Sequence, residues 1–179
     1  KPAILFVFHS ITEELEHLEE YISEILRGLE SLGHQTVAIL NNSDAGSIII
    51  REKMKQGKKP FMRFYKNVPR ADYAGLMNTV DVLVGNSSSG ILEATTFKLP
   101  AVNIGSRERG RLQGINVINA DYTARSIIEA VEKALSQSFK EKMKDCVNPY
   151  GDGASAPRIV KVLAETVIDD KLLVKNITY

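Results

Sequence analysis

Short apolar runs alternate with amphipathic segments along most of this sequence. The first run, at residues 3–8, is continuously apolar, which is typical of a strand buried on both faces of a sheet. Further runs predict strands at residues 36–40, 61–65, 82–84, 100–104 and 115–118. Helical patterns separate most of these runs, so most strands are expected to reach the next through a helix. This alternation predicts an α/β fold with a three-layer, Rossmann-like, doubly wound parallel sheet.

The helical segments carry start and stop signals. In residues 10–32, leucine and isoleucine recur at spacings of three and four, which predicts one apolar helix face. Ser10 and Glu13 match a capping box at its start, and Gly33 is expected to end it. The other predicted helices span residues 48–56, 70–79, 91–99, 123–136, 139–146 and 156–169. The sequence has no evident repeat or internal boundary, so residues 1–179 are expected to form a single domain.

A cluster of small polar residues, Gly85-Asn-Ser-Ser-Ser-Gly90, directly follows the strand at 82–84; we call it the serine turn. In open parallel sheets, the junction between a strand end and a helix start is where ligands bind. A helix start supplies backbone N–H groups and the serines add hydroxyl donors, a combination suited to phosphate. Glu93 is expected one turn into the helix, where its carboxylate can accept hydrogen bonds from sugar hydroxyls. The same serines are also good helix caps, so a turn without a ligand is the simpler interpretation.

Polar residues follow other predicted strands as well. They are His9, Asn42 with Asp44, and Arg107 with Arg109 and Arg111. Because parallel strands end at the same edge of a sheet, these residues are expected to converge with the serine turn. Hydroxyls, an imidazole and a guanidinium together suit a diphosphate, and the loop around Val68 could hold a base. The sequence therefore predicts a nucleotide-binding domain, although it contains neither a Gly-x-Gly-x-x-Gly fingerprint nor a P-loop.

Composition narrows the function classes. The net charge of +1 gives no electrostatic argument for binding nucleic acid or an acidic membrane. A single cysteine, Cys146, excludes an internal disulfide and a Cys-rich zinc site, so no metal or cofactor is expected. No apolar run approaches the roughly 20 residues that span a bilayer, and a cytoplasmic protein is expected. The opening Lys1-Pro2, without methionine, suggests that the sequence begins inside a longer protein.

Several motifs follow one another along the chain. They are Phe8-His9, Asn42-Ser-Asp-Ala-Gly-Ser47, Asn67-Val-Pro69, Gly85-Asn-Ser-Ser-Ser-Gly-Ile-Leu-Glu93, Pro100-Ala-Val-Asn-Ile-Gly-Ser-Arg107 and Asn148-Pro-Tyr-Gly-Asp-Gly153. In this order they resemble the carboxyl-terminal half of UDP-N-acetylglucosamine 2-epimerases. The form Asn86-Ser-Ser-Ser89 is similar to the hydrolysing branch, whereas the non-hydrolysing branch usually carries Asp-Ser-Gly-Gly there.

The resemblance implies an enzyme with two Rossmann-like domains in the glycosyltransferase-B arrangement, with UDP-GlcNAc bound between them. The implied reaction is elimination of UDP to a 2-acetamidoglucal, followed by addition of water on the other face. The hydrolysing products are N-acetylmannosamine, used for sialic-acid-type sugars, and UDP. The resemblance also implies that the full-length protein is a homo-oligomer.

The resemblance assigns a role to seven residues of this sequence. Ser87 and Ser88 would hold the diphosphate, Glu93 the ribose and Val68 the uracil, while Asn42 and Arg107 would line the nucleotide pocket and His9 would be catalytic. The family often has a proline where this chain has Ser10. Its acid and base carboxylates lie mostly in the amino-terminal domain, which is missing here. This chain alone is therefore expected to bind UDP without turning over substrate.

Other functions fit the same features. The chain could be the donor-binding domain of a glycosyltransferase, which also uses a helix start for the diphosphate and a carboxylate for the ribose. It could be half of a non-hydrolysing 2-epimerase that yields UDP-ManNAc. It could also be a regulatory module that senses nucleotide sugars, or an α/β domain that uses the same sheet edge to bind a protein partner.

Overall fold

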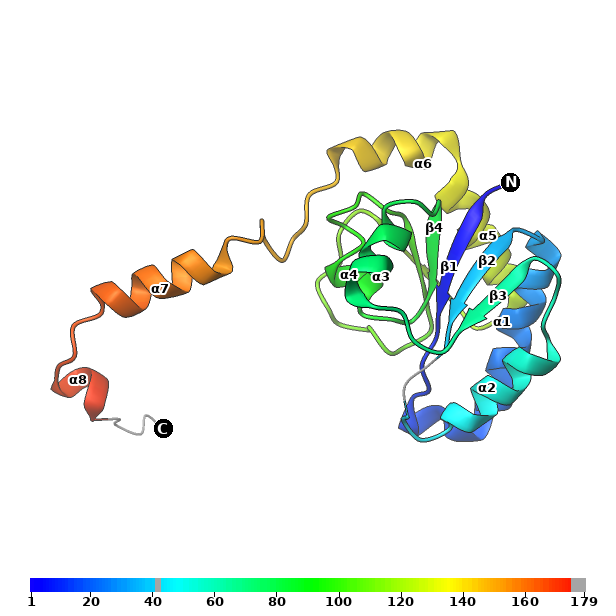
Figure 1. Ribbon diagram of the computed structural model, residues 1–179, viewed down its shortest axis with the longest axis horizontal. Helices are drawn as coiled ribbons and strands as arrows, with labels where there is room; N and C mark the ends of the chain where they lie inside the picture. The colour runs from blue at the N-terminus through cyan, green and yellow to red at the C-terminus, as the bar shows by residue number, and fades with distance from the viewer. Residues whose placement is uncertain (41–42, 175–179) are drawn as a thin grey trace. The chain divides into compact units, whose positions relative to one another are not determined.

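A computed structural model describes residues 1–40 and 43–174 (Figure 1). The chain divides into two compact units, Lys1–Pro149 and Tyr150–Tyr179, which we call unit 1 and unit 2. The boundary falls inside the Asn148-Pro-Tyr-Gly-Asp-Gly153 motif. Its proline and glycines are typical of a turn between elements.

Unit 1 is built on a sheet of six strands in the order β3-β2-β1-β4-β5-β6. The strands are β1 (Ala3–Val7), β2 (Gln35–Ile39), β3 (Met62–Tyr65), β4 (Val82–Gly85), β5 (Ala101–Ile104) and β6 (Val117–Ala120). Every neighbouring pair is parallel. This arrangement confirms the predicted α/β fold with a doubly wound parallel sheet, in the strand order common among dinucleotide-binding folds.

The helices of unit 1 are α1 (Leu18–Leu32), α2 (Ser47–Gln56), α3 (Arg70–Met77), α4 (Ser89–Leu92), α5 (Ala124–Leu135) and α6 (Gln137–Lys142), with short 3-10 helices η1 (Thr12–His17) and η2 (Met143–Asp145). The helices up to α4 connect successive strands from β1 to β5, β5 reaches β6 through a loop, and the remaining helices follow β6. Figure 1 shows α1 and α2 on one side of the sheet and α3 and α4 on the other, which gives the three layers.

Alternation along β1 divides the core between the two sides of the sheet. Ile4 and Phe6 pack with α1, α2 and α5, whereas Leu5 and Val7 pack with Met77 and the segment after α4. All four of these β1 side chains are at most 5% exposed. Neighbouring side chains of a strand point to opposite faces, so a continuously apolar strand requires a cover on both.

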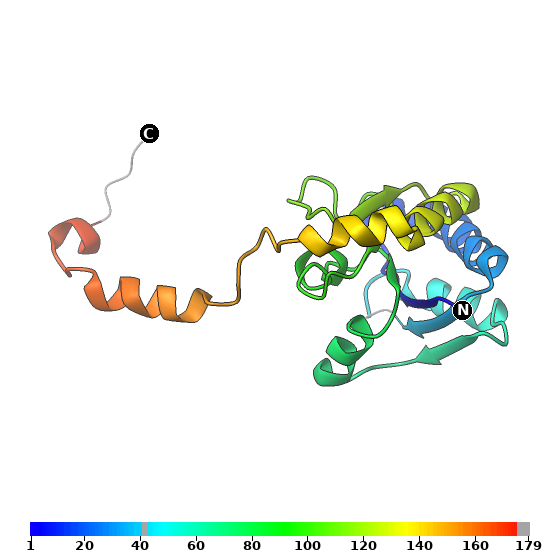
Figure 2. The ribbon, with the colours of Figure 1, turned by 90° about the horizontal axis from the view of Figure 1, so that it is seen from above.

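Helices α1 and α5 lie side by side over one face of the sheet (Figure 2). Gly28 allows the approach, since a Cβ there would lie 3.3 Å from the carbonyl oxygen of Ala124. At the same crossing, Glu24 Oε2 accepts a hydrogen bond of 3.0 Å from the backbone N–H of Ala124. As predicted, α1 ends at Gly33, whose φ of 59° is left-handed.

The predicted capping box at Ser10 and Glu13 is wrong. The chain forms η1 first, after Ile11 and without a side-chain cap, and α1 begins only at Leu18. Ser10 is 6% exposed and therefore turned into the interior, away from the helix start. Glu14 explains the tighter η1 turn, because its carboxylate is held by hydrogen bonds from Ser106 and Tyr122 in the loops after β5 and β6. Tertiary contacts thus override the local cap.

The predicted helix at 91–99 is also shorter than expected, since α4 ends at Leu92. Buried Asn116 competes for the carbonyl groups that a longer helix would use. Its Nδ2 donates to Gly90 O at 3.0 Å and to Leu99 O at 3.2 Å. Its Oδ1 accepts from Thr95 Oγ1 at 3.0 Å, which holds the chain after α4 in a series of turns.

The ends of β1 and β4 approach closely at Gly85. Its φ of 140° is rarely accessible to residues with a side chain, and a Cβ there would lie 1.9 Å from the carbonyl oxygen of Val7. Val7 and Gly85 are also paired across the two strands. Only glycine fits at this position.

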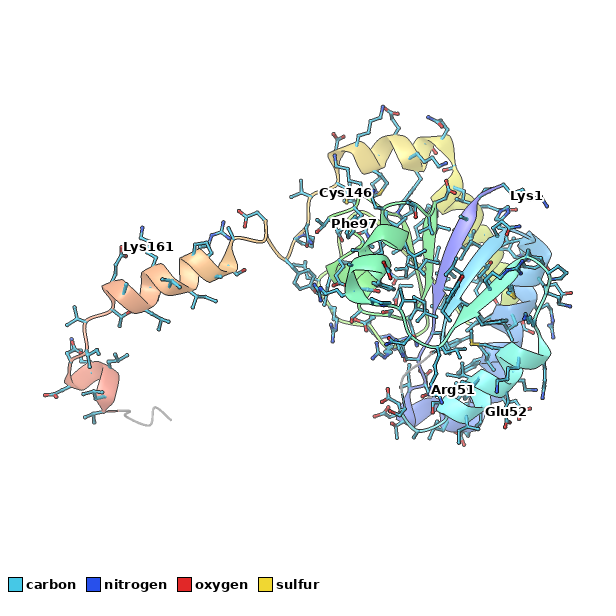
Figure 3. All side chains as sticks on the ribbon, viewed as in Figure 1. Lys1, Arg51, Glu52, Phe97, Cys146 and Lys161 are labelled. Atoms are coloured by element: carbon cyan, nitrogen blue, oxygen red, sulfur yellow. The ribbon has the colours of Figure 1, made fainter. Side chains whose placement is uncertain are left out.

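Unit 2 contains α7 (Ser155–Glu165) and α8 (Asp170–Leu173). Figure 3 shows the side chains of α7, Lys161 among them, projecting around the helix. No residue of α7 is buried, and Ile159 and Leu163 are 59% and 72% exposed. Arg158 in the first turn of α7 and Asp152 before the helix form a bidentate ion pair with contacts of 2.8 and 2.7 Å. Within residues 1–40 and 43–174, no helix is long and apolar enough to cross a membrane.

Candidate functional site

The order of the strands reverses between β1 and β4, because the chain builds β2 and β3 on one side of β1 and β4 to β6 on the other. Such a switch point leaves a crevice at the carboxyl ends of the two strands, where ligands of open α/β sheets bind. His9 follows the end of β1, and the serine turn follows the end of β4. Arg107 follows β5, the next strand along. These three predicted groups therefore share one edge.

Asn86, the first residue after β4, joins two of these groups. Its side chain is fully buried, and its Oδ1 accepts a 2.7 Å hydrogen bond from the backbone N–H of His9. Its Nδ2 donates a 2.8 Å bond to the carbonyl oxygen of His9. The pair of bonds continues the contact between β1 and β4 beyond their last ladder bonds and fixes the backbone of His9 beside the serine turn.

Arg107 completes the group from the side of β5. Its Nη1 donates to the carbonyl oxygen of Asn86 at 3.1 Å, so the guanidinium lies against the serine turn. The same Nη1 lies 3.0 Å from Oε1 of Glu108, a carboxylate only 1% exposed. Oε2 of Glu108 lies 3.0 Å from Nε of Arg111. The guanidinium of Arg107 thus stands next to the turn, and the buried carboxylate of Glu108 joins it to the guanidinium of Arg111.

The serine turn contains a chain of hydroxyl groups. Ser87 Oγ lies 2.9 Å from Ser89 Oγ, which lies 2.6 Å from the hydroxyl of Tyr73 on α3. Burial raises the pKa of Tyr73, and the hydrogen bond to Ser89 offsets part of this. The hydroxyl of Ser88 caps no helix N–H, although Ser88 precedes α4. Since α4 has four residues, its dipole is small, and the hydroxyl and guanidinium donors provide most of the anion-binding capacity.

Glu93 lies directly after α4, as the residue that caps its carboxyl end. Arg70 Nη2 lies 3.4 Å from its Oε1, and both residues line a cavity of about 220 Å³ with Tyr73. Val68 lines a different cavity of about 530 Å³, between the loop after β3 and α3. The two predicted contacts for a ribose and a base therefore flank α3 in separate hollows. Asn42 lies outside the described residues.

A further cavity of about 680 Å³ lies at the ends of β5 and β6. Tyr21 and Tyr122 stack in its wall with ring centroids 3.8 Å apart, and Glu14 bonds to the hydroxyl of Tyr122. Burial, together with that bond, raises the pKa of Tyr122. The loop residues Arg109 and Arg111 also line this cavity, whereas His9 and the serine turn do not.

Three residues that hold this edge together were missed from sequence. The sequence pattern indicates only that Asn86 and Ser89 belong to a polar turn and that Glu108 lies between two arginines. An asparagine directly after a glycine-ended buried strand is a signal for Asn86, but nothing local indicates that its partner is His9. Within residues 1–40 and 43–174, no group of three or more His, Cys, Asp or Glu side chains could hold a metal ion.

Known proteins match this chain in sequence. Its residues 1–164 match the family model described as UDP-N-acetylglucosamine 2-epimerase. A UDP-N,N'-diacetylbacillosamine 2-epimerase (hydrolyzing) of Legionella pneumophila is 31% identical over 180 residues, covering 100% of this chain and 47% of that protein. A GDP/UDP-N,N'-diacetylbacillosamine 2-epimerase (hydrolyzing) of Campylobacter jejuni is also 31% identical, covering 98% and 46%. The chain spans less than half the length of these relatives.

Solved structures share the fold. The S. aureus MnaA–UDP co-structure matches with a TM-score of 0.73 at 18% identity, over 91% of this chain and 44% of that one. The Methanocaldococcus jannaschii UDP-GlcNAc 2-epimerase in complex with UDP-GlcNAc and UDP matches with a TM-score of 0.69 at 18% identity, over 92% and 46%. The parallel α/β domain thus corresponds to one half of glycosyltransferase-B-like epimerase structures. With 164 of its 179 residues inside the family model, the chain belongs to the UDP-N-acetylglucosamine 2-epimerase family.

Proposed function

We propose that this chain is the UDP-binding, carboxyl-terminal half of a 2-epimerase that converts UDP-GlcNAc to N-acetylmannosamine and UDP. The observation that carries the proposal is the link through Asn86, which ties the backbone of His9 and the guanidinium of Arg107 to the serine turn at the switch point of the sheet. An arginine beside hydroxyl donors suits a diphosphate. In this proposal residues 1–179 form one functional domain, and the missing amino-terminal half supplies the acid and base carboxylates.

Each residue has a defined part in the proposed complex. Ser87 and Ser88 donate to the diphosphate, Arg107 and Asn42 line the nucleotide pocket, Glu93 accepts from the ribose hydroxyls and Val68 meets the uracil through its main chain. His9 stabilises the charge on departing UDP, as an imidazolium does beside any developing phosphate charge. Arg70 already neutralises part of the charge of Glu93, and its long side chain can move aside when a ribose enters.

The proposed reaction has two steps. The proton on C2 and the UDP on C1 leave together, which forms a carbon–carbon double bond and a 2-acetamidoglucal. Water then adds its hydroxyl to C1 and a proton to C2 on the other face, giving N-acetylmannosamine. Two relatives with "hydrolyzing" in their names, and the Asn86-Ser-Ser-Ser89 form of the turn, support hydrolysis over release of UDP-ManNAc.

A second substrate has specific support. The Legionella and Campylobacter relatives are named for N,N'-diacetylbacillosamine, a sugar with a second acetamido group. An Escherichia coli relative at 27% identity, named polysialic acid biosynthesis protein P7, supports an N-acetylmannosamine product for sialic-acid-type sugars instead. Assaying the longer protein with both UDP-sugars, and identifying the free sugar released, separates these candidates. A cytoplasmic homo-oligomer is part of the same proposal.

Calorimetric titration of this chain with UDP tests the central claim, with uridine as the control that lacks the diphosphate. We expect saturable binding of one UDP per chain and weaker binding of uridine. Equal affinities for UDP and uridine would show that the chain makes no favourable contact with the diphosphate. Transfer of sugar to an acceptor by the longer protein, with no free N-acetylmannosamine, would instead indicate a glycosyltransferase. In that longer protein, His9→Ala should reduce turnover more than UDP affinity.

A further inference from the structure

We propose that Glu108 is a positioning residue that holds the guanidinium of Arg107 in place for a diphosphate. This inference rests on the proposed function of the same site. Glu108 is 1% exposed and follows Arg107 directly in the loop after β5. Its Oε1 lies 3.0 Å from Nη1 of Arg107, which also donates to the carbonyl oxygen of Asn86 at 3.1 Å.

The two acceptors on Nη1 define how the guanidinium is oriented. A guanidinium is planar, so fixing one nitrogen between two acceptors also fixes the direction of the remaining donors. Nη2 and Nε of Arg107 form no hydrogen bond with any of the described residues. The side chain of Arg107 is 30% exposed, so part of it can be reached from solvent, and in this inference its free donors meet the ligand at the serine turn. A long side chain that is ordered before binding loses less conformational freedom when the ligand arrives.

The charges explain why a buried acid beside an anion site is tolerable. Oε2 of Glu108 lies 3.0 Å from Nε of Arg111, whose side chain is 49% exposed. Glu108 therefore forms ion pairs with two cations, of which only the contact with Arg107 has hydrogen-bond geometry. Two neighbouring cations offset the charge of the buried carboxylate and so reduce its repulsion of an incoming anion. Arg111 offsets part of the negative charge of Glu108. Glu108 can therefore orient the guanidinium of Arg107 while the positive charge of Arg107 stays available to an anion.

Two substitutions separate orientation from charge. Glu108→Met keeps a long side chain in the buried space but removes both acceptors, whereas Glu108→Gln keeps an acceptor oxygen and removes the charge. If Glu108 orients Arg107, Glu108→Met should weaken UDP binding about three- to tenfold with uridine binding unchanged, and Glu108→Gln should retain affinity close to the parent. If Glu108 only reduces the positive charge of the site, both variants should bind UDP more tightly, which would overturn the inference.

A double-mutant cycle identifies the residue through which Glu108 acts. In an Arg107→Ala background, the effect of Glu108→Met on UDP binding should disappear, because the positioned group is gone. An effect that persists there, or an equal loss of UDP and uridine binding, would overturn the inference in favour of a general structural role. Arg111→Ala keeps the contact between Glu108 and Arg107 and should leave uridine binding unchanged.

An NMR measurement keeps the test decisive in every case. The Nε–Hε group of Arg107 should be ordered in the parent and lose order in Glu108→Met but not in Glu108→Gln. Unchanged order in Glu108→Met would overturn the inference. If the parent binds neither UDP nor uridine, the proposed function fails. The order of the Arg107 Nε–Hε group, measured by NMR, then still shows whether Glu108 positions the guanidinium. If Glu108→Met does not fold, Glu108→Asp, which withdraws the acceptor by one methylene, replaces it with the same expected loss of order and of UDP affinity.

Discussion

Helices α5 and α7 carry the same kind of sequence pattern and meet different surroundings. In α5, Ile127 and Val131 lie four residues apart and are completely buried against α1 and the sheet. In α7, Ile159 and Leu163 have the same spacing and are more than half exposed. An amphipathic pattern therefore predicts a helix and its apolar face, but it does not specify what covers that face. In unit 1 the sheet supplies the cover, and the two short helices described in unit 2 do not supply one to each other.

The largest expected difference between the two helices is in stability. Ile127→Ala should lower the free energy of unfolding of unit 1 by about 2–5 kcal/mol, because it leaves a cavity in a fully packed core. Ile159→Ala, the matched change in α7, should alter it by less than about 0.5 kcal/mol. Urea unfolding followed by circular dichroism measures both. A comparable loss for Ile159→Ala would show that the face of α7 is covered after all.

The second contrast concerns ligand binding. Arg107→Ala in unit 1 should weaken UDP binding by about 1.5–3 kcal/mol, the range for a lost charge-assisted hydrogen bond. Arg158→Ala removes an equal charge from unit 2 and should leave the affinity unchanged. Titration calorimetry at constant ionic strength compares the two. Equal losses would mean that overall charge attracts UDP, without a specific contact at the serine turn.

Cys146 marks the last buried position before the unit boundary. It packs with Phe139 and Met143 and is 6% exposed, while the next residue, Val147, is 78% exposed. Burial raises the pKa of the Cys146 thiol, so less thiolate forms at a given pH than from an exposed cysteine. At pH 8 we expect disulfide-exchange reagents to modify it several-fold more slowly than free cysteine. The rate should rise in Ile127→Ala, whose core opens more often. If Cys146 in the parent reacts as fast as free cysteine, the boundary between unit 1 and unit 2 lies earlier in the chain than Pro149. Figure 3 labels this residue.

The smallest effect is expected at the start of unit 2. The ion pair with Arg158 lowers the pKa of Asp152 to about 2. Since this pKa is depressed in the folded unit, the pair is fully formed above the ordinary aspartate value of about 3.9 and is lost as the pH falls through about 2. An NMR titration of the Asp152 carboxyl carbon measures this directly. Arg158→Ala should return the midpoint toward the ordinary value, and an ordinary midpoint in the parent would exclude the pair in solution.

Sequence patterns were sufficient for most of the fold of unit 1. The buried strands appear as unbroken apolar runs, and polar residues at their carboxyl ends gave His9, the serine turn and Arg107. Two local predictions failed for the same physical reason. The cap expected at Ser10 and the helix expected at 91–99 were displaced by contacts from distant residues, namely the partners of Glu14 and the side chain of Asn116.

The candidate site shows the same limit. His9, the serine turn and Arg107 could be predicted as members because strand ends are encoded locally and parallel strands end at the same edge of a sheet. The links between them could not, because Asn86 reaches His9 across 77 positions and Arg107 reaches Asn86 across 21. The role of Glu108 could not be predicted either, because one acid between arginines has the sequence pattern of an exposed charged loop. Only the structure shows that its side chain is buried.

The close approach at Gly85 has a consequence for how this protein can change over generations. Any side chain at this position would have to push apart the ends of two neighbouring strands, and the groups that carry His9 and the serine turn are attached just beyond those ends. The serines of the turn stand beyond this contact, so we expect their substitution to leave the two strand ends in place. The gap between the strand ends cannot widen in the same way, because a Cβ at residue 85 would lie 1.9 Å from the carbonyl oxygen of Val7. Sequence variation is therefore expected to be tolerated in the turn and not at Gly85.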